Sequence, residues 1–235
     1  MGSPVQSKGK GSIRKRLAFM ICMIAALLVG IQTALGLFLG LNVMSYIVGE
    51  DHKRLAVVLS NATSQMIDDE VKKLEDISSA PAWKDATVSG NLKYISMDDD
   101  SIAKYMAEMD KRWADSENSG PFIKLYTDSS LSAEMTDIIK ENNEIAEIML
   151  TDMRGALIAA SGETTDFYQG DEDWWQKAFA GGDGRKFIGE VSFDESANVL
   201  AIAFAFPVQG GGLGPGRAAG VMKVVVNTDK FFEPL

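Results

Sequence analysis

The chain is poor in the residues that most often build covalent and metal-dependent sites. Its 235 residues include one cysteine, Cys22, and one histidine, His52. A single cysteine excludes a disulfide within the chain and a cysteine-based metal site. A single histidine argues against a zinc hydrolase and a Ser-His-Asp triad, and no two carboxylates have a spacing that singles them out as a catalytic pair. The sequence therefore predicts no enzyme, no catalytic residue, no metal and no cofactor.

Two motifs that could suggest ligand sites have simpler local explanations. The glycine-rich stretch 210–216 lacks the Lys-Ser/Thr that completes a phosphate-binding loop, so we expect a hairpin loop there. Asp98, Asp99 and Asp100 could form a metal cluster, but no further ligands follow at loop spacing. Capping and dipole compensation at the start of a helix over Met97–Trp113 explain them better.

Acidic residues are absent before Glu50, where the chain instead carries a long apolar run. Residues 17–41 are interrupted only by Gln32 and Thr33, and as a helix they would span about 37 Å, enough for a bilayer core. Five basic residues precede the run. The positive-inside rule therefore predicts a basic cytoplasmic tail at 1–16, a transmembrane helix at 17–41 in the inner (cytoplasmic) membrane, and periplasmic or extracellular residues from about 42 onward. A cleaved signal peptide is the rival interpretation.

The part beyond the apolar run is acidic. It holds all 33 acidic residues of the chain, and five of the 23 basic residues lie before it. This balance argues against nucleic acid and anionic lipid as partners.

A long helix is predicted directly after the membrane segment. Apolar residues recur at helical spacing from Val48 to Ile77, and Pro81 ends the pattern, so 42–80 is expected to be a stalk helix. Its apolar stripe is narrow enough for the seam of a homodimer, and packing on its own domain is the alternative. Residues 81–144 should be a helical segment, with a second helix at Ser132–Asn143 capped by Ser132.

From residue 145 the pattern changes to strands. Alternation and turn residues predict a short helix, capped by Asp171, that lies across a sheet. The predicted elements are the strands Ile145–Leu150, Ala156–Ala160, Lys186–Phe193, Val199–Val208 and Ala218–Val226 and the helix Asp171–Phe179. The predicted fold class is α+β, with a PAS-like five-stranded antiparallel sheet and flanking helices over residues 145–235.

The strand Val199–Val208 has two unequal faces. Leu200, Ile202, Phe204 and Phe206 should fill a core on one side. Small residues, mostly alanines, lie on the other side, which leaves two alternatives: a helix packed closely on the strand, or the wall of a cavity.

The last 90 residues resemble the Cache family of extracytoplasmic sensor domains. The resemblance rests on the order and spacing of several short motifs, namely Thr151-Asp152-x-x-Gly155, Gly170-Asp171-x-x-Trp174-Trp175-x-x-Ala178, Phe187-Ile188-Gly189-Glu190-Val191-Ser192-Phe193-Asp194, Ala205-Phe206-Pro207-Val208 and Gly220-Val221-Met222. It implies a ligand between the sheet and the aromatic helix. The implied site has Tyr168, Asp173, Trp174 and Trp175 over the pocket, Asp152 and Glu190 at its polar edges, and Phe204 on the facing strand.

The residues themselves leave a simpler alternative for parts of that site. The two tryptophans could belong to the core of a small domain, and Asp152 with Gly155 could serve only the turn. Tryptophan faces beside carboxylates would suit an amine or another small metabolite. Amino-acid-binding members of the family carry an arginine near the aromatic helix, and Asp171-Glu172-Asp173 stand in that neighbourhood here, which argues against an amino acid.

The expected function is ligand sensing by the outer domain of a membrane-bound receptor. By the resemblance, that receptor would be a chemoreceptor, a histidine kinase or a cyclic-dinucleotide enzyme, and the chain would be a fragment that ends before a second transmembrane helix. The alternative is a membrane-anchored structural or interaction module without a small-molecule ligand.

Overall fold

The computed structural model describes residues 10–115, 119–210 and 216–233. The chain divides into two units, Met1–Met66 and Ile67–Leu235. Most of the glycine-rich stretch predicted as a hairpin loop, residues 211–215, lies outside the described residues.

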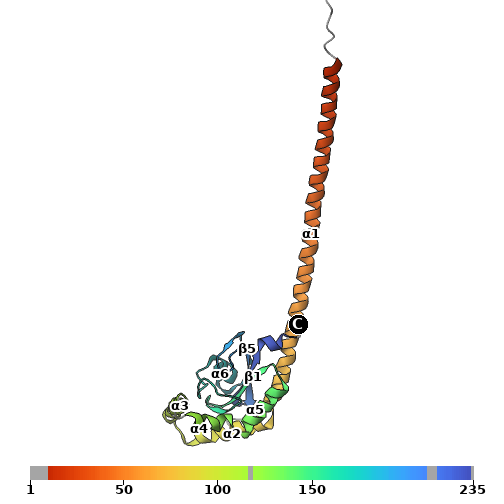
Figure 1. Cartoon of the computed structure of the whole chain (residues 1–235). Helices are drawn as coiled ribbons and strands as arrows, with labels where there is room; N and C mark the ends of the chain where they lie inside the picture. The colour runs from red at the N-terminus through yellow and green to blue at the C-terminus, as the bar shows by residue number, and fades with distance from the viewer. Residues whose placement is uncertain (1–9, 116–118, 211–215, 234–235) are drawn as a thin grey trace, which may run out of the picture. The chain divides into compact units, whose positions relative to one another are not determined.

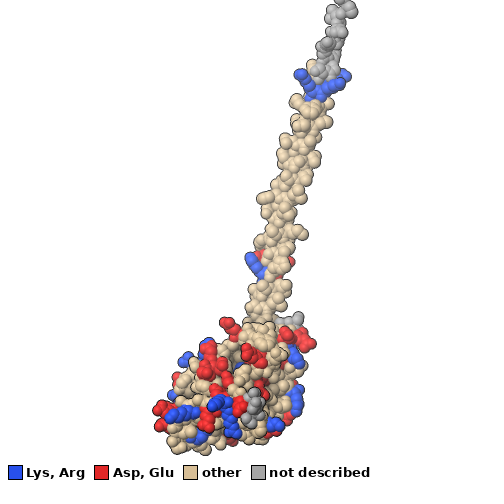
Figure 2. Space-filling view, turned by 60° about the vertical axis from the view of Figure 1, so that its left-hand side comes forward, with Lys and Arg blue, Asp and Glu red and all other residues tan. Residues whose placement is uncertain are grey.

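The first helix, α1, runs from Lys10 to Ser78. Figure 2 shows a length of this helix without charged side chains, which corresponds to the sequence between Arg16 and Glu50. By length and composition, α1 is the one helix of the described chain that could cross a membrane. It ends three residues before Pro81, which occupies the first turn of α2, where a missing N–H costs nothing.

The second unit contains the remaining helices and a single sheet (Figure 1). Its helical elements are α2 Pro81–Asn91, η1 Leu92–Ser96, α3 Asp99–Trp113, α4 Ser119–Thr127, α5 Ser130–Glu141, α6 Asp173–Phe179, η2 Ala180–Gly182 and α7 Thr228–Phe231. Its strands are β1 Ile145–Asp152, β2 Leu157–Ala160, β3 Phe187–Ile188, β4 Ser192–Asp194, β5 Val199–Gln209 and β6 Ala218–Asn227. The predicted α+β class is confirmed.

The sheet is antiparallel, with strand order β2-β1-β6-β5-β3, and β4 also pairs with β5. The predicted strand over 186–193 is therefore interrupted, since Phe187–Ile188 and Ser192–Asp194 pair with β5 as two separate short strands. The central strand β6 is buried along nearly its whole length, as expected for a strand covered on both faces.

Helices cover both faces of the sheet. α2 and α5 contact one face, which we call the back face, and α6 contacts the other, the front face. Neighbouring residues of β6 point to opposite faces of the sheet. A side chain at Gly220 would meet Thr87 of α2 on the back face, whereas Val221 packs on the front face in the cluster that contains Trp175 of α6.

The back face holds the bulky side of β5. Ile202, Phe204 and Phe206 are buried as predicted, and burial of one phenylalanine contributes about 1.5–3 kcal/mol. Leu200 departs from the prediction, since it is 46% exposed. It lies at the start of β5, opposite Phe193 of the short edge strand β4, and Phe193 is itself 59% exposed.

Helix caps agree with the sequence at one of three positions. Asp98 caps α3, where its carboxylate accepts a hydrogen bond from the Ser101 N–H at 2.8 Å, as predicted. The cap of α5 is Ser129 instead of Ser132, and α6 begins after Glu172 instead of Asp171. In both cases several capping residues are adjacent, and local sequence alone does not choose between them.

Candidate functional site

A cleft opens on the front face between α6, the β3–β4 edge and the floor of the sheet. It consists of two adjoining hollows of about 630 and 190 Å³. Both are lined by Glu172 and Trp174 from the α6 region and by Asp194 and Lys223 from the sheet. We call this region the front cleft.

The small residues on the front face of β5 form both a close helix contact and a cavity wall, the two alternatives that the sequence left open. Ala205 is fully buried in the cluster that contains Trp175, so the helix approaches closely there. Two residues earlier on the same face, Ala203 lines the 630 Å³ hollow. The alanine face is therefore a helix contact at one position and a cavity wall at the next.

The floor of the cleft holds a nearly buried ion pair. The Lys223 ammonium lies 3.1 Å from the Asp194 carboxylate, and their side chains are 11% and 13% exposed. The same ammonium lies 5.5 Å from the ring centre of Trp174. Burial raises the pKa of Asp194, but the hydrogen bond from the Ala197 N–H and the charge of Lys223 outweigh burial, and the net pKa is lowered. The charged form of Asp194 is therefore favoured, and its ion pair with Lys223 fixes the floor.

Glu147 lies beside this pair on β1. The Ser196 hydroxyl lies 2.5 Å from the Glu147 Oε2 and 2.8 Å from the Asp194 Oδ1, and its single proton can be donated to one of these carboxylates at a time. Glu147 is 4% exposed, and its Oε1 has no hydrogen-bond partner in the described structure. Burial raises the pKa of Glu147, against the opposing effects of Ser196 and Lys223.

We expect Glu147→Gln to stabilise the protein at pH 7 by about 1 kcal/mol, because it removes a buried charge with an unpaired oxygen. The pKa of Glu147 is higher in the folded protein than in the unfolded chain. The contribution of this carboxyl to stability is therefore fully present below the unfolded pKa, and it is lost as the pH rises through the folded pKa. The gain should therefore vanish at pH 4. Urea unfolding at both pH values, followed by tryptophan fluorescence, measures it, and an equal gain at both would contradict the assignment.

Carboxylates without partners surround the mouth of the front cleft. In the described chain, the side chains of Glu172, Glu190 and Glu195 line the two hollows and make no hydrogen bond or ion pair. Asp173 is exposed at the rim and pairs with Lys177 at 2.6 Å. Both lysines that line the cleft are thus already paired with acids, and the remaining charge is negative.

Three of the residues expected from the sequence come together in this cleft, and the others do not. Asp173, Trp174 and Glu190 line it. Trp175 donates a hydrogen bond from its indole N–H to the Thr151 hydroxyl at 2.9 Å and stacks on Phe179 at 4.6 Å, and it lines a different hollow of about 300 Å³ together with Tyr168.

Phe204 lies on the opposite side of the sheet from α6. Its neighbours along β5, Ala203 and Ala205, point to the front face, so the Phe204 side chain points to the back face, where it is fully buried. It belongs to the core there and lines neither the front cleft nor the 300 Å³ hollow beside Trp175.

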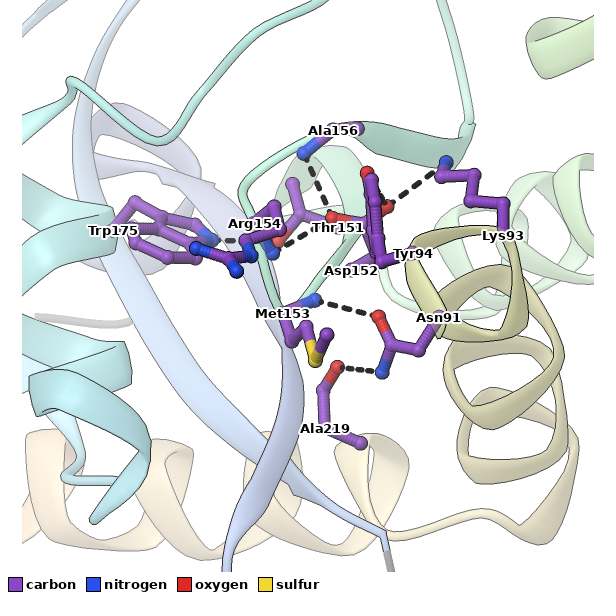
Figure 3. A network of polar contacts seen from close by, with 10 residues as sticks. All are labelled: Asn91, Lys93, Tyr94, Thr151, Asp152, Met153, Arg154, Ala156, Trp175 and Ala219. Carbon is purple, nitrogen blue, oxygen red and sulfur yellow. Dashed lines mark hydrogen bonds and ion pairs between the residues drawn. The ribbon is translucent and has the colours of Figure 1, made fainter. Parts of the chain in front are cut away.

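Asp152 is enclosed by donors of the protein itself (Figure 3). Its Oδ1 accepts the N–H groups of Arg154 and Ala156 at 2.9 and 3.0 Å. Its Oδ2 accepts the Tyr94 hydroxyl at 2.6 Å and lies 3.0 Å from the Lys93 ammonium. The side chain is 0% exposed. Asp152 joins the β1–β2 turn to η1, and its carboxylate has no face open to a ligand.

The sequence analysis missed the residues that make the floor. Lys223 is the single charged residue of the apolar strand β6, and Glu147 lies in a strand that is otherwise mostly apolar. A charge inside a central strand is costly unless it is paired, and this signal could have marked both positions. Their partners, Asp194 and Ser196, follow only from the strand pairing.

No protein-family model matches the chain, and no curated protein matches it. Among solved structures it is similar to the extracellular domain of a protein described as a histidine kinase, rpHK1S-Z16 (14% identity, TM-score 0.38, 74% of this chain and 64% of that one). It is also similar to the sensory domain of the Campylobacter jejuni chemoreceptor Tlp3 with isoleucine bound (13% identity, TM-score 0.34, 72% of this chain and 64% of that one). A third similar structure is the E. coli DcuS sensor domain (15% identity, TM-score 0.35, 57% of this chain and 94% of that one).

These structures are extracellular or sensory domains, the class of domain that the sequence resemblance indicates. The chain spans less than two thirds of the length of the first two.

Proposed function

We propose that the unit Ile67–Leu235 is the extracytoplasmic ligand-sensing domain of a membrane-bound receptor, and that it binds a small amine in the front cleft. The observation that carries the proposal is the set of unpaired carboxylates, Glu172, Glu190 and Glu195, around a cleft walled by Trp174. An amine that enters this cleft gains charge neutralisation from the rim and contact area from the indole.

The fixed ion pair on the floor supports this choice of charge. Lys223 is neutralised by Asp194, so it leaves little free positive charge to bind an acid and little to repel an amine. Lys177 is likewise held by Asp173 at the rim. The unpaired charged groups that remain, Glu172, Glu190 and Glu195, accept hydrogen bonds when they are ionised, and an ammonium group supplies donors only.

The membrane arrangement is part of the proposal. Residues 17–41 would span the inner membrane, 1–16 would stay in the cytoplasm, and the sensing unit would lie outside. The helix α1 is continuous from Lys10 to Ser78, and a helix without a break is suited to pass a displacement along its length. We propose that its stalk part also forms the homodimer seam. The output would be a chemotaxis, kinase or cyclic-dinucleotide module outside this sequence.

A membrane-anchored module without a ligand is the second candidate. It is favoured by the low exposure of Trp174 and Trp175, which is 8% for each, and by the enclosure of Asp152. In that case the front cleft would be a surface hollow, and the aromatic helix would serve only the core.

Calorimetric titration of the full chain with matched amines and alcohols tests the proposal. We expect phenethylamine and butylamine to bind, whereas phenethyl alcohol and butanol do not. Trp174→Ala should weaken amine binding about tenfold, and Glu190→Gln about two- to fivefold, because an exposed charge contributes less than an aromatic face. Glu141→Gln is the control, since Glu141 is exposed at the end of α5 on the back face. If no amine binds at 10 mM, the anchored module is the better description.

A further inference from the structure

A second cleft lies between α3 and the turn that joins β1 to β2. Its volume is about 540 Å³, within the range of small-molecule sites. The α3 side presents two pairs of apolar residues four positions apart, Ile102 with Met106 and Ala103 with Ala107. The small alanines leave room above the buried isoleucine and methionine. We call this the α3 cleft, and it shares no lining residue with the front cleft.

Tyr168 forms the opposite wall and is held in place. The Asp110 Oδ1 accepts the N–H groups of Phe167 and Tyr168 at 3.0 and 2.9 Å, and Tyr168 forms a β-bridge with Ala156. A side chain at Gly170 would come within 2.6 Å of the tyrosine ring, so glycine is needed for the ring to lie there. The Tyr168 hydroxyl itself makes no hydrogen bond in the described chain. Burial, then the charges of Asp171 and Asp110, raise its pKa, which keeps it a donor at neutral pH.

Arg154 supplies the second donor of the α3 cleft. Its guanidinium pairs with Asp99 at 3.2 Å, and the two side chains are 43% and 89% exposed. An ion pair this exposed contributes little, roughly 0–1 kcal/mol, so the guanidinium can exchange its partner at small cost. A guanidinium fork matches a carboxylate in geometry, with two parallel hydrogen bonds.

We propose that the α3 cleft binds a small monocarboxylate with a branched apolar body. The carboxylate would replace Asp99 on Arg154 and accept a hydrogen bond from Tyr168, while the apolar body lies on Ile102 and Met106. The other acid of the cleft, Asp110, is engaged in holding the Phe167–Tyr168 backbone. An ammonium group next to the ligand carboxylate would lie close to the guanidinium, so the acid should bind better than the corresponding amino acid. The proposal does not depend on the front cleft.

Three compounds that differ by one group test the ligand class by calorimetry on the full chain in lipid nanodiscs. They are 4-methylpentanoate, its amide and leucine. We expect the acid to bind, the amide to bind at least tenfold more weakly because it lacks the charge, and leucine to bind more weakly than the acid.

Four variants test the location. Arg154→Gln should weaken binding of the acid about tenfold, and Ala107→Phe, at an exposed position of α3, should block it by filling the cleft. Asp99→Asn should strengthen it two- to fivefold, because a competitor for the guanidinium is removed. Arg185→Gln, at another exposed arginine, is the control.

Trp174→Ala separates this proposal from the preceding one, since it should weaken amines and leave the acid unchanged. The α3 proposal is overturned if 4-methylpentanoate does not bind at 10 mM, if Arg154→Gln binds it equally well, or if leucine binds more tightly than the acid.

Discussion

Asp152→Ala is expected to lower the free energy of unfolding by about 3–5 kcal/mol, the range found when one partner of a buried ion pair is removed. The carboxylate is 0% exposed and serves four donors (Figure 3). Its loss leaves the Tyr94 hydroxyl and the N–H groups of Arg154 and Ala156 without their acceptor. Water cannot fully replace it, because Tyr94 and Ala156 are themselves buried.

Two milder substitutions serve as controls. Asp152→Asn keeps an acceptor oxygen and the volume but loses the charge, so about 1–3 kcal/mol should be lost. Asp99→Asn breaks an ion pair whose carboxylate is 89% exposed and should change stability by less than about 0.5 kcal/mol.

Urea unfolding followed by tryptophan fluorescence is a suitable measurement. All four tryptophans, at positions 83, 113, 174 and 175, lie in the unit Ile67–Leu235, so the signal reports on that unit. A loss below 1 kcal/mol for Asp152→Ala would mean that the network contributes little.

Gly220→Ala is the second large effect, with an expected loss of about 3 kcal/mol or more, at or above the upper end for overpacked positions. Gly220 lies in the central strand β6, paired with Asp152 on one side and Val208 on the other. A Cβ at this position would collide with the backbone carbonyl oxygen of Thr151 and would lie 2.8 Å from the Thr87 side chain. Backbone in the middle of a sheet cannot move aside as a side chain can.

Gly162→Ala is the matched control, because no atom lies within 4 Å of its Cβ position. The control should be neutral or slightly stabilising, since alanine restricts the unfolded chain. Comparable losses in both variants would show that the cost comes from glycine replacement in general and not from the contact between β6, β1 and α2.

Local sequence predicted the elements well where the signal is local. Pro81 marked the end of α1 to within three residues, and Asp98 marked the start of α3. The alternation in 199–208 gave β5 and its core face. Prediction failed where neighbouring residues can each cap a helix, as with Ser129 and Ser132 at α5, or where an edge strand is interrupted, as between Ile188 and Ser192.

The candidate site was only partly accessible from the sequence. The aromatic helix pointed to Asp173 and Trp174, and the motif that follows it pointed to Glu190. Asp152 and Phe204 were expected in the same pocket because they belong to matching motifs. A motif does not report on which face of a strand a side chain lies, or how many donors the protein already directs to it.

The sequence by itself determined the general make-up of this protein: an apolar helix able to cross a membrane and an acidic part of mixed α and β structure, with a single histidine and a single cysteine. These properties depend on composition and on residues a few positions apart. Only the tertiary structure decided what the clefts contain. Lys223 meets Asp194 across 29 positions and Glu147 meets Ser196 across 49, since strand pairing joins distant segments at a register that nearby residues do not set.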